Sequence, residues 1–427
     1  MRYKISEWHT QCHVATAMYH SVLLLSVAHA SVLRDSCDAR TGGGCASIPA
    51  SASEAASLME YRQLGHSGLL VSRLSYGAWI TFASFSDDEA YNLMRLCVDA
   101  GINFFDNAEA YNDGLAEEVM GRALKRLEVE YPLPRSRIVV TTKIFFGTDR
   151  GSDKPGRWIP NSKGLSRKHI VEGLTASLHR LQVDYVDVVF AHRPDPHTPM
   201  EEIVRAFNHV IDQGMAFYWC TSEWSAAELT EAYAVADRLN LVGPVCEQPQ
   251  YSMLQRQRFE GEYRELYDTR GLGTTIWSSL SSGVLTGKYN EGIPEGSRLA
   301  RSDSSWILTQ FRSGGRHKEV GGWDEIIKRV ASLAPIAKSI ECTMAQLAIG
   351  WCLKNEDVTT VILGATKLSQ LEDNFGALKC ATRMGASVMD QIEAVLDNAP
   401  VVGAPIPIPD TPVDWNPNPT ANRLRAD

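Results

Sequence analysis

From residue 74 onward, short runs of β-branched and aromatic residues alternate with amphipathic stretches of helical period. The runs that predict strands are residues 74–78, 102–107, 138–144, 186–192, 217–222, 245–250, 274–279 and 360–364. The stretches that predict helices include residues 87–99, 116–127, 166–181, 201–213, 226–239 and 343–354. Strands that alternate with helices are typical of parallel βαβ units, and this series predicts an α/β protein with a single (β/α)8 TIM barrel.

The main rival is a doubly wound sheet, whose nucleotide site begins with a glycine-rich fingerprint. No GxGxxG sequence follows an early predicted strand: the glycines at 42–44 come before any strand, and those at 271 and 273 precede a strand. The P-loop pattern GxxxxGK[ST] is also absent from the sequence. The barrel is therefore preferred, and its active site is expected where the strands end at their C-terminal edge.

The two ends of the chain differ from the patterned region. Residues 1–58 carry no net charge and include a small, polar stretch at 42–57, so we expect a disordered, low-complexity extension. Residues 59–399 are expected to form the barrel, and residues 400–427 a Pro-rich tail. The apolar stretch 17–30 follows basic residues and ends in AHA like a secretory signal, but His20 and Ser26 interrupt it. A targeting segment, a regulatory tail and a gene-model extension are all open interpretations of residues 1–58.

Composition narrows the function classes. The 427 residues carry a formal net charge of −9, which argues against nucleic-acid binding, since that needs a basic surface. No apolar run approaches the roughly 20 residues of a membrane-spanning helix. The nine cysteines are scattered without a CxxC pair, which indicates reduced thiols and a cytoplasmic protein. From residue 59 onward, the sequence has no HxxxH pattern and no cluster of Cys and His residues that would indicate a metal site.

Polar side chains stand at or after the ends of several predicted strands, among them Asp106, Tyr111, Lys143 and His192. A carbonyl group that accepts hydride develops negative charge on its oxygen and needs a proton donor. Tyrosine is a poor acid at neutral pH unless a cation stabilises its phenolate, and Lys143 can supply that cation. Asp106 can neutralise and orient the lysine, and His192 can hydrogen-bond the carbonyl oxygen. This set predicts reduction of a small carbonyl substrate.

Two motifs carry a family resemblance. FFDNAEAYNDGLAEEVMGRAL (residues 104–124) and VVTTKIF (139–145) resemble the signatures of the aldo-keto reductases, and the resemblance extends from residue 61 to about residue 396. Within that family, the chain is most similar to the β subunits of voltage-gated potassium channels and their microbial and plant relatives. The matching stretches are residues 165–202, CEQPQYSM (246–253) and GVLTGKY (283–289).

The resemblance implies a role for each matching residue. Tyr111 would be the general acid, Lys143 and Asp106 would tune its pKa, and His192 would orient the substrate. The cofactor-binding residues that the resemblance implies are Trp79, Ser222, Gln248, Trp277, Ser278, Leu280, Ser282, Lys288, Arg298, Gly364, Thr366, Gln370, Asp373 and Asn374. A basic residue and a hydroxyl beside a helix N-terminus form an anion site, which favours NADP(H) over NAD(H).

The chain also departs from the channel-type relatives. His192 stands where they carry Asn, so together with Asp106, Tyr111 and Lys143 it restores the four catalytic residues of the efficient reductases. Glu223 stands where they carry Arg, and Ser279 stands where they carry Pro. We therefore expect an NADPH-dependent reductase that converts aldehydes or ketones to alcohols. The alternative is a channel-associated accessory subunit that uses bound NADP(H) as a redox sensor. The first allows a monomer, while the second predicts a homo-tetramer. Neither hypothesis identifies the substrate or a channel partner.

Overall fold

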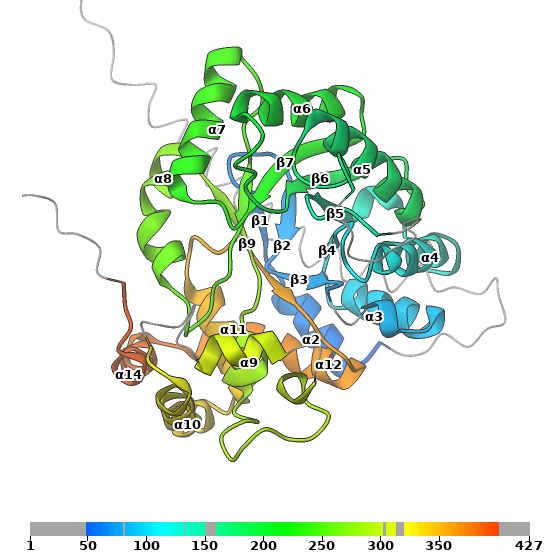
Figure 1. The fold of residues 1–427 in the computed structure, drawn as a ribbon. Helices are drawn as coiled ribbons and strands as arrows, with labels where there is room; N and C mark the ends of the chain where they lie inside the picture. The colour runs from blue at the N-terminus through cyan, green and yellow to red at the C-terminus, as the bar shows by residue number, and fades with distance from the viewer. Residues whose placement is uncertain are drawn as a thin grey trace, which may run out of the picture.

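The protein forms a closed barrel of parallel strands surrounded by helices (Figure 1). This computed structural model describes residues 48–79, 82–131, 133–149, 159–301, 305–312 and 320–400. The barrel order is β10-β3-β4-β5-β6-β7-β8-β9. Its strands are β3 (Leu74–Gly77), β4 (Phe104–Asp106), β5 (Val139–Ile144), β6 (Val186–Ala191), β7 (Ala216–Ser222), β8 (Cys246–Gln248), β9 (Gly273–Ile276) and β10 (Thr360–Leu363). The predicted (β/α)8 TIM barrel is confirmed.

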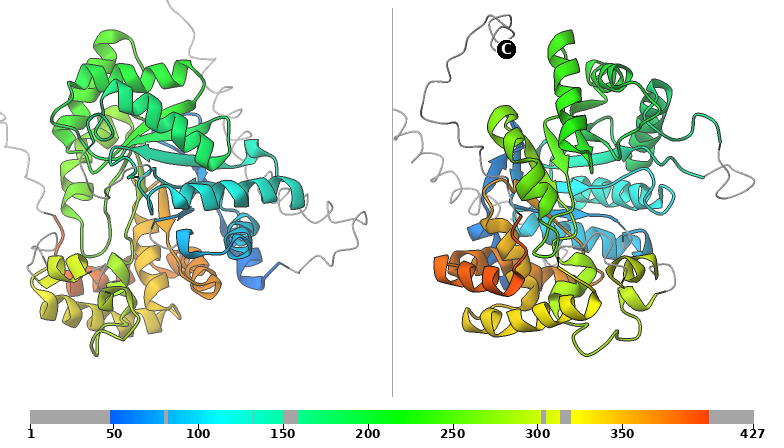
Figure 2. Two further views of the ribbon diagram at one scale, coloured as in Figure 1. Left: turned by 45° about the vertical axis from the view of Figure 1, so that its right-hand side comes forward. Right: turned by 60° about the vertical axis from the view of Figure 1, so that its left-hand side comes forward.

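The helices pack around the outside of the barrel. They are α3 (Asp87–Asp99), α4 (Leu115–Glu130), α5 (Arg167–Leu181), α6 (Met200–Asp212), α7 (Ala226–Leu239), α8 (Arg264–Arg270), α9 (Ser305–Arg312), α10 (Trp323–Ser339), α11 (Met344–Lys354), α12 (Leu368–Phe375), α13 (Ala377–Arg383) and α14 (Ala386–Leu396). Side-chain caps explain why α3, α7 and α11 begin where they do. Ser86, Ser225 and Thr343 each form a capping box with the Glu or Gln three residues later, which satisfies two exposed backbone N–H groups. Figure 2 shows α14 packed beside α10 at the C-terminal end of the described chain.

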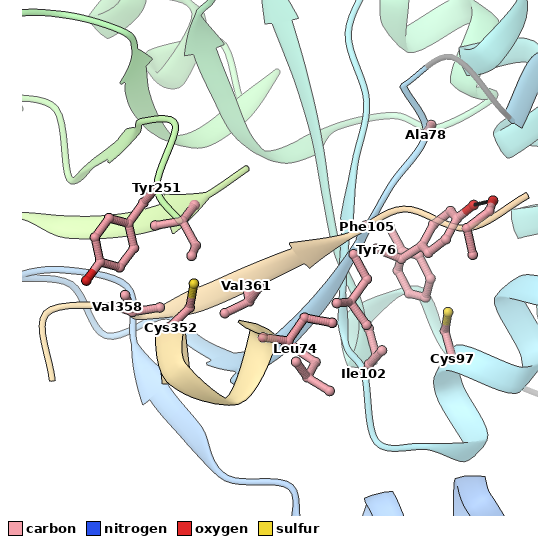
Figure 3. Packing of buried hydrophobic residues seen from close by; sticks show 14 of the residues in the cluster. Leu74, Tyr76, Ala78, Cys97, Ile102, Phe105, Tyr251, Cys352, Val358 and Val361 are labelled. Carbon is pink, nitrogen blue, oxygen red and sulfur yellow. Dashed lines mark hydrogen bonds between the residues drawn. The ribbon is translucent and has the colours of Figure 1, made fainter. Parts of the chain in front are cut away.

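The core lies between the strands and the helices. Figure 3 shows Leu74 and Val361, on neighbouring strands, among side chains from the surrounding helices that include Cys97 and Cys352. All four are buried. Removing such apolar area from water stabilises the fold by about 25 cal/mol per Å². The strands have little freedom to move as a result, and they hold their C-terminal ends in fixed register.

A hairpin that the hydrophobic pattern did not predict closes the N-terminal end of the barrel. Strands β1 (Tyr61–Gln63) and β2 (Leu70–Ser72) pair in antiparallel register. Leu64 and Val71 of this hairpin join a buried cluster with Phe104 and Val139 at the start of barrel strands. Each of its strands has only three residues, too short for a period-2 pattern to stand out.

The N-terminal extension contains a helix where disorder was expected. Residues 50–58 form α2 (Ala50–Leu58), which contacts α3, α12 and α13. Ala52 and Ala55 are buried at 0% and 2% exposure, and Glu54 pairs with Lys379 at 2.7 Å. In Figure 1, α2 lies beside α12. The ordered structure therefore begins before residue 59. Small alanines supply the buried face, so hydrophobic patterning gave little signal. Residues 1–47 and 401–427, expected to be an extension and a Pro-rich tail, lie outside the described residues.

None of the helices in the described ranges is long and apolar enough to cross a bilayer.

Candidate active site

Parallel register brings three of the predicted site residues to one end of the barrel. Asp106 is the last residue of β4, Lys143 lies one residue before the end of β5, and His192 directly follows β6. Asp106 is in register with Thr141 of β5, and Lys143 with Phe190 of β6. This is the C-terminal edge of the strands, where TIM-barrel enzymes place their chemistry.

Lys143 is the centre of the cluster. Its ammonium group donates to Asp106 Oδ2 at 2.5 Å, to the Asn107 carbonyl at 2.8 Å and to Tyr111 Oη at 3.0 Å. The side chain is fully buried. A lysine ammonium has three protons, so every proton has an acceptor. A buried charge is tolerated only when it is paired and fully hydrogen-bonded, and this arrangement meets both conditions.

Asp106 is held by other strands as well. Its Oδ1 accepts hydrogen bonds from Thr141 Oγ1 at 2.9 Å and from Gln248 Nε2 at 3.2 Å. Gln248 Nε2 also donates to Thr275 Oγ1 at 3.2 Å. Strands β4, β5, β8 and β9 therefore all contribute to the position of one carboxylate, which leaves the lysine little freedom to rotate away.

The loop between β4 and α4 places Tyr111. Asn112, Asp113 and Gly114 adopt left-handed φ angles of 48°, 56° and 83°, which turn the chain sharply into α4. Asn107 fixes the start of the loop, because its Nδ2 donates to the Ala116 carbonyl at 3.0 Å. Asn and Asp tolerate the left-handed region better than most residues, and Gly adopts it without cost. The turn directs the Tyr111 hydroxyl onto the lysine.

The pKa values of the cluster are shifted in a consistent way. Burial raises the pKa of Tyr111 above 10, against the opposing effect of the Lys143 cation. Burial disfavours the charged form of Lys143, but Asp106 and Tyr111 outweigh it and raise the pKa of the ammonium. Burial and the cations of Lys143 and Arg193 lower the pKa of His192 well below 6.5. At neutral pH the tyrosine and lysine therefore carry their protons, and His192 is neutral.

His192 packs edge-on against two aromatic rings, with centroid distances of 5.7 Å to Tyr111 and 5.1 Å to Phe146. Within the described ranges its Nδ1 is buried without a hydrogen-bond partner. Buried polar atoms nearly always have a partner, so an orphan nitrogen at this rim is suited to a polar atom of a ligand.

Three of the predicted cofactor residues lie on β7, β8 and β9 or just beyond. Ser222 Oγ donates to the Gln248 carbonyl at 3.0 Å, and Trp277 follows β9. Trp277 meets Trp79 edge-on at 5.8 Å, and the Arg298 guanidinium lies 5.7 Å from the Trp79 ring centroid. Trp79, Trp277 and Arg298 therefore form one continuous wall at the rim.

The segment after Trp277 has an unusual backbone. Ser278, Ser281 and Ser282 have φ angles of 64°, 47° and 57°, and Gly283 has 89°. Left-handed residues in such segments form concave nests of N–H groups that bind anions. Lys288 lies close by, because a Cβ on Gly283 would come within 2.8 Å of its Nζ. Leu280, the remaining predicted residue of this loop, is half-buried. A concave N–H array beside a lysine suits a phosphate group.

The last βα unit is brought together only in part. Gln370 Oε1 accepts from both the backbone N and Oγ1 of Thr366 at 2.9 Å, just before α12 begins, and a Cβ on Gly364 would meet open space. Asp373 is instead turned toward α11, where its carboxylate accepts from Thr343 Oγ1 at 3.1 Å and Gln346 Nε2 at 2.9 Å. Asn374 is buried in the second half of α12.

The roles of two carboxylates near the rim, the buried Glu109 and the partly buried Glu223, were not predicted from the sequence. Glu109 Oε1 accepts from the backbone N–H groups of Phe145 and Gly147, both at 2.8 Å, and fixes the turn after β5. Glu223, treated only as a departure from relatives, accepts from Gln250 N at 2.7 Å and Trp277 Nε1 at 3.0 Å. Glu109 lies between Asp106 and Tyr111 in the motif, and this position is the one signal that could have revealed it.

Trp158 lies outside the described residues, as do residues 302–304 and 313–319. No group of three or more metal-ligating side chains that could hold an ion occurs in the described ranges.

Comparison with known proteins agrees with the barrel fold. The model of the aldo/keto reductase family, whose members are NAD(P)H-dependent oxidoreductases, matches residues 73–397. A protein of Arabidopsis thaliana named as a probable voltage-gated potassium channel subunit beta is 50% identical over 344 residues, covering 80% of this chain and 98% of the relative. A protein of Oryza sativa subsp. japonica with the same name is 51% identical over the same coverage. The match to the family model spans the whole barrel, from β3 to α14, so the chain belongs to the aldo/keto reductase family.

Proposed function

We propose that this protein reduces aldehydes or ketones to alcohols with NADPH, and that Tyr111 donates the proton. The observation that carries the proposal is the fully hydrogen-bonded ammonium group of Lys143, which joins Asp106 and Tyr111 in a buried cluster. Members of the aldo/keto reductase family are oxidoreductases that use nicotinamide cofactors. That the cofactor is NADPH and that the substrate is a carbonyl compound are what we propose in addition.

Proton transfer follows from the hydrogen-bond directions. Lys143 donates to Tyr111 Oη, so the phenol's own proton is free to point away from the lysine toward a substrate oxygen. As the carbonyl oxygen gains negative charge, Tyr111 gives up this proton. The phenolate that results lies 3.0 Å from an ammonium group, and this lowers the cost of its formation. Asp106 keeps the buried lysine charge paired throughout.

His192 orients the substrate. Its pKa lies well below 6.5, so at neutral pH the ring carries one N–H and one lone pair. The N–H can donate to the carbonyl oxygen beside Tyr111, because the two rings are 5.7 Å apart. A neutral imidazole holds the oxygen in place without competing with Tyr111 as the acid.

The bound cofactor would supply hydride to the carbonyl carbon. The nest at residues 278–283, with Lys288, fits its phosphates, and the Trp79–Trp277 wall offers aromatic surface at the rim. Arg298 and Thr366 would favour the additional phosphate of NADPH. The remaining proposed contacts are Ser222, Gln248, Leu280, Gly364, Gln370, Asp373 and Asn374.

Substitution of the proposed acid tests this function. Tyr111→Phe removes the hydroxyl and keeps the ring, so the rate of NADPH oxidation with an aromatic aldehyde should fall about 10²- to 10⁴-fold. The dissociation constant for NADPH, measured by fluorescence, should stay unchanged. Tyr185→Phe is the matched control, because Tyr185 packs on Phe217 at the opposite end of the barrel. A Tyr111→Phe rate equal to wild type would show that another group is the acid.

A second function has one observation in its favour. Two relatives covered over 98% of their length are named as probable voltage-gated potassium channel β subunits. We propose as the alternative that this chain is a cytoplasmic accessory subunit, assembles as a tetramer and uses bound NADP(H) as a redox sensor. Light scattering of the purified protein and co-purification with a co-expressed potassium channel test it. A monomer that does not co-purify with the channel would rule out this alternative and leave the reductase proposal intact.

A further inference from the structure

Two cysteines join the segment after α10 to helix α13. Cys342 directly precedes Thr343, the N-cap residue of α11, and is half-buried. Cys380 on α13 is buried, with 1% of its surface exposed. Burial and the neighbouring Cys342 thiol both raise the pKa of the Cys380 thiol. The Cys342 thiol also donates to the Ile340 carbonyl at 3.4 Å, which fixes its direction. Both thiols are free in this structure.

A separate set of contacts holds the two segments together. Arg383 lies three residues after Cys380, on the same face of α13. Its guanidinium donates to the carbonyls of Ile340 at 3.0 Å and Glu341 at 3.1 Å, and pairs with the Glu341 carboxylate at 3.3 Å. Residues 340–342 are therefore anchored to the face of α13 that carries Cys380, so the closeness of the two thiols follows from the packing of the backbone.

The segment also leads directly to the proposed cofactor site. Cys342 precedes Thr343, the N-cap of α11. Thr343 Oγ1 and Gln346 Nε2 both donate to the Asp373 carboxylate of α12, at 3.1 and 2.9 Å. Because Thr343 directly follows Cys342, a change in the position of residue 342 would disturb the contact between Thr343 and Asp373. The cysteine pair is thus linked to α12 through Thr343 and Gln346 at the start of α11.

We propose that Cys342 and Cys380 are a redox-reactive dithiol, which small-molecule disulfides such as oxidised glutathione convert to a disulfide, and that this weakens NADPH binding by displacing α12, which Asp373 ties to Thr343 and Gln346. The effect on NADPH rests on the proposed function, whereas the dithiol site does not. Cytosolic disulfides of this kind are typically transient and regulatory.

The reaction proceeds by two exchanges. The Cys342 thiolate attacks one sulfur of oxidised glutathione, the glutathione S–S bond breaks, and one glutathione thiolate leaves. Cys380 then loses its proton and attacks the Cys342 sulfur, which forms the protein S–S bond and releases the second glutathione thiolate. The two protein thiols lose two electrons, oxidised glutathione gains them, and the two released protons end on the two glutathione thiolates.

Exposure sets the order of the two steps. Cys342 is half-buried and reachable, so it reacts first. Burial, together with the neighbouring Cys342, raises the pKa of Cys380, so it reacts as the second thiol. Cys220 and Cys246 are also neighbours, because the residues that follow them, Thr221 and Glu247, pair between β7 and β8, but both cysteines are fully buried inside the barrel. They supply an internal reference pair that should stay reduced.

The site is tested on the full-length protein treated with oxidised glutathione. Tandem mass spectrometry should locate a bond between Cys342 and Cys380, and none between Cys220 and Cys246. Cys342→Ser should abolish this bond, and Cys380→Ala should stop the reaction at a glutathione adduct on Cys342. Wild-type protein that gives only the adduct, or no modification at Cys342, would overturn the proposal.

The link to the cofactor is tested by titration of NADPH into reduced and oxidised protein. Oxidation should weaken binding about tenfold, and dithiothreitol should restore it. Cys342→Ser should keep the reduced affinity under both conditions. A mapped disulfide with unchanged NADPH affinity would overturn the link to Asp373. Reduced protein that binds no NADPH would overturn the proposed function instead, and the mapped bond would still decide the dithiol site.

Discussion

Glu247 on β8 is a fully buried carboxyl whose charge the fold disfavours. Burial raises its pKa to about 8, against hydrogen bonds from Thr221 Oγ1 at 2.5 Å and Trp224 N at 3.2 Å. The folded-state pKa exceeds that of the unfolded chain, so this group's stability contribution is complete below about pH 4.5 and is lost as pH rises through about 8. Glu247→Gln should therefore gain free energy of unfolding relative to wild type by up to about 1.4 kcal/mol per pH unit across that window. Urea unfolding at several pH values measures this difference.

Glu128→Gln on the exposed face of α4 is the control, and its free energy of unfolding should depend on pH as that of wild type does. If Glu247→Gln also showed the wild-type pH dependence, the raised pKa of Glu247 would be contradicted.

Helix α2 is an element whose only buried side chains are small. Ala52 is fully buried and contributes to the contact with the helices beneath, while Glu54 and Lys379 form a half-exposed ion pair. Ala52→Glu places an unpaired charge in this contact and should release α2, at a cost of about 1–3 kcal/mol. Glu54→Ala breaks only the surface pair and should cost less than about 1 kcal/mol. Hydrogen exchange of the amides in residues 50–58 distinguishes the two variants. Equal protection in both would show that the ion pair, rather than the alanine face, holds the helix.

At the scale of the whole molecule, the hairpin of β1 and β2 packs against the start of β9, a strand that lies about 200 residues later in the sequence. Gly65 adopts a φ of 57°, and a Cβ there would overlap the Val245 carbonyl and lie 2.7 Å from Gly273 N. Gly65→Ala should push the hairpin away from the barrel and lower the stability of the entire domain by more than about 2 kcal/mol. Calorimetry should show one transition at a lower midpoint. Gly68→Ala is the control, because nothing lies within 4 Å of its added methyl. Similar midpoints for both would mean that the hairpin does not support the barrel.

The sequence predicted the barrel well because its signals are local and repeated. Residues 87–99 and 226–239 coincide with α3 and α7, since caps and amphipathic periods mark both helices. Asp106, Lys143 and His192 could be found because polar residues at the ends of buried strands stand out. Glu109 could not be found in this way, because its role depends on backbone N–H groups that folding brings to it. The orientation of Asp373 toward α11 likewise depends on a tertiary contact that no local pattern records.

The barrel also separates two kinds of constraint along each strand. The hairpin and its glycine contact occupy one end, and Asp106, Lys143 and His192 occupy the other. Changes in the loops at the chemical end therefore do not have to be compensated at the supporting end. A lineage of such proteins could exchange rim loops, and with them substrates, while the residues that stabilise the fold at the hairpin end stay unchanged. For the same reason, directed evolution of a new substrate range should begin with the loops at residues 82–86 and 299–301 and leave residues 61–72 untouched.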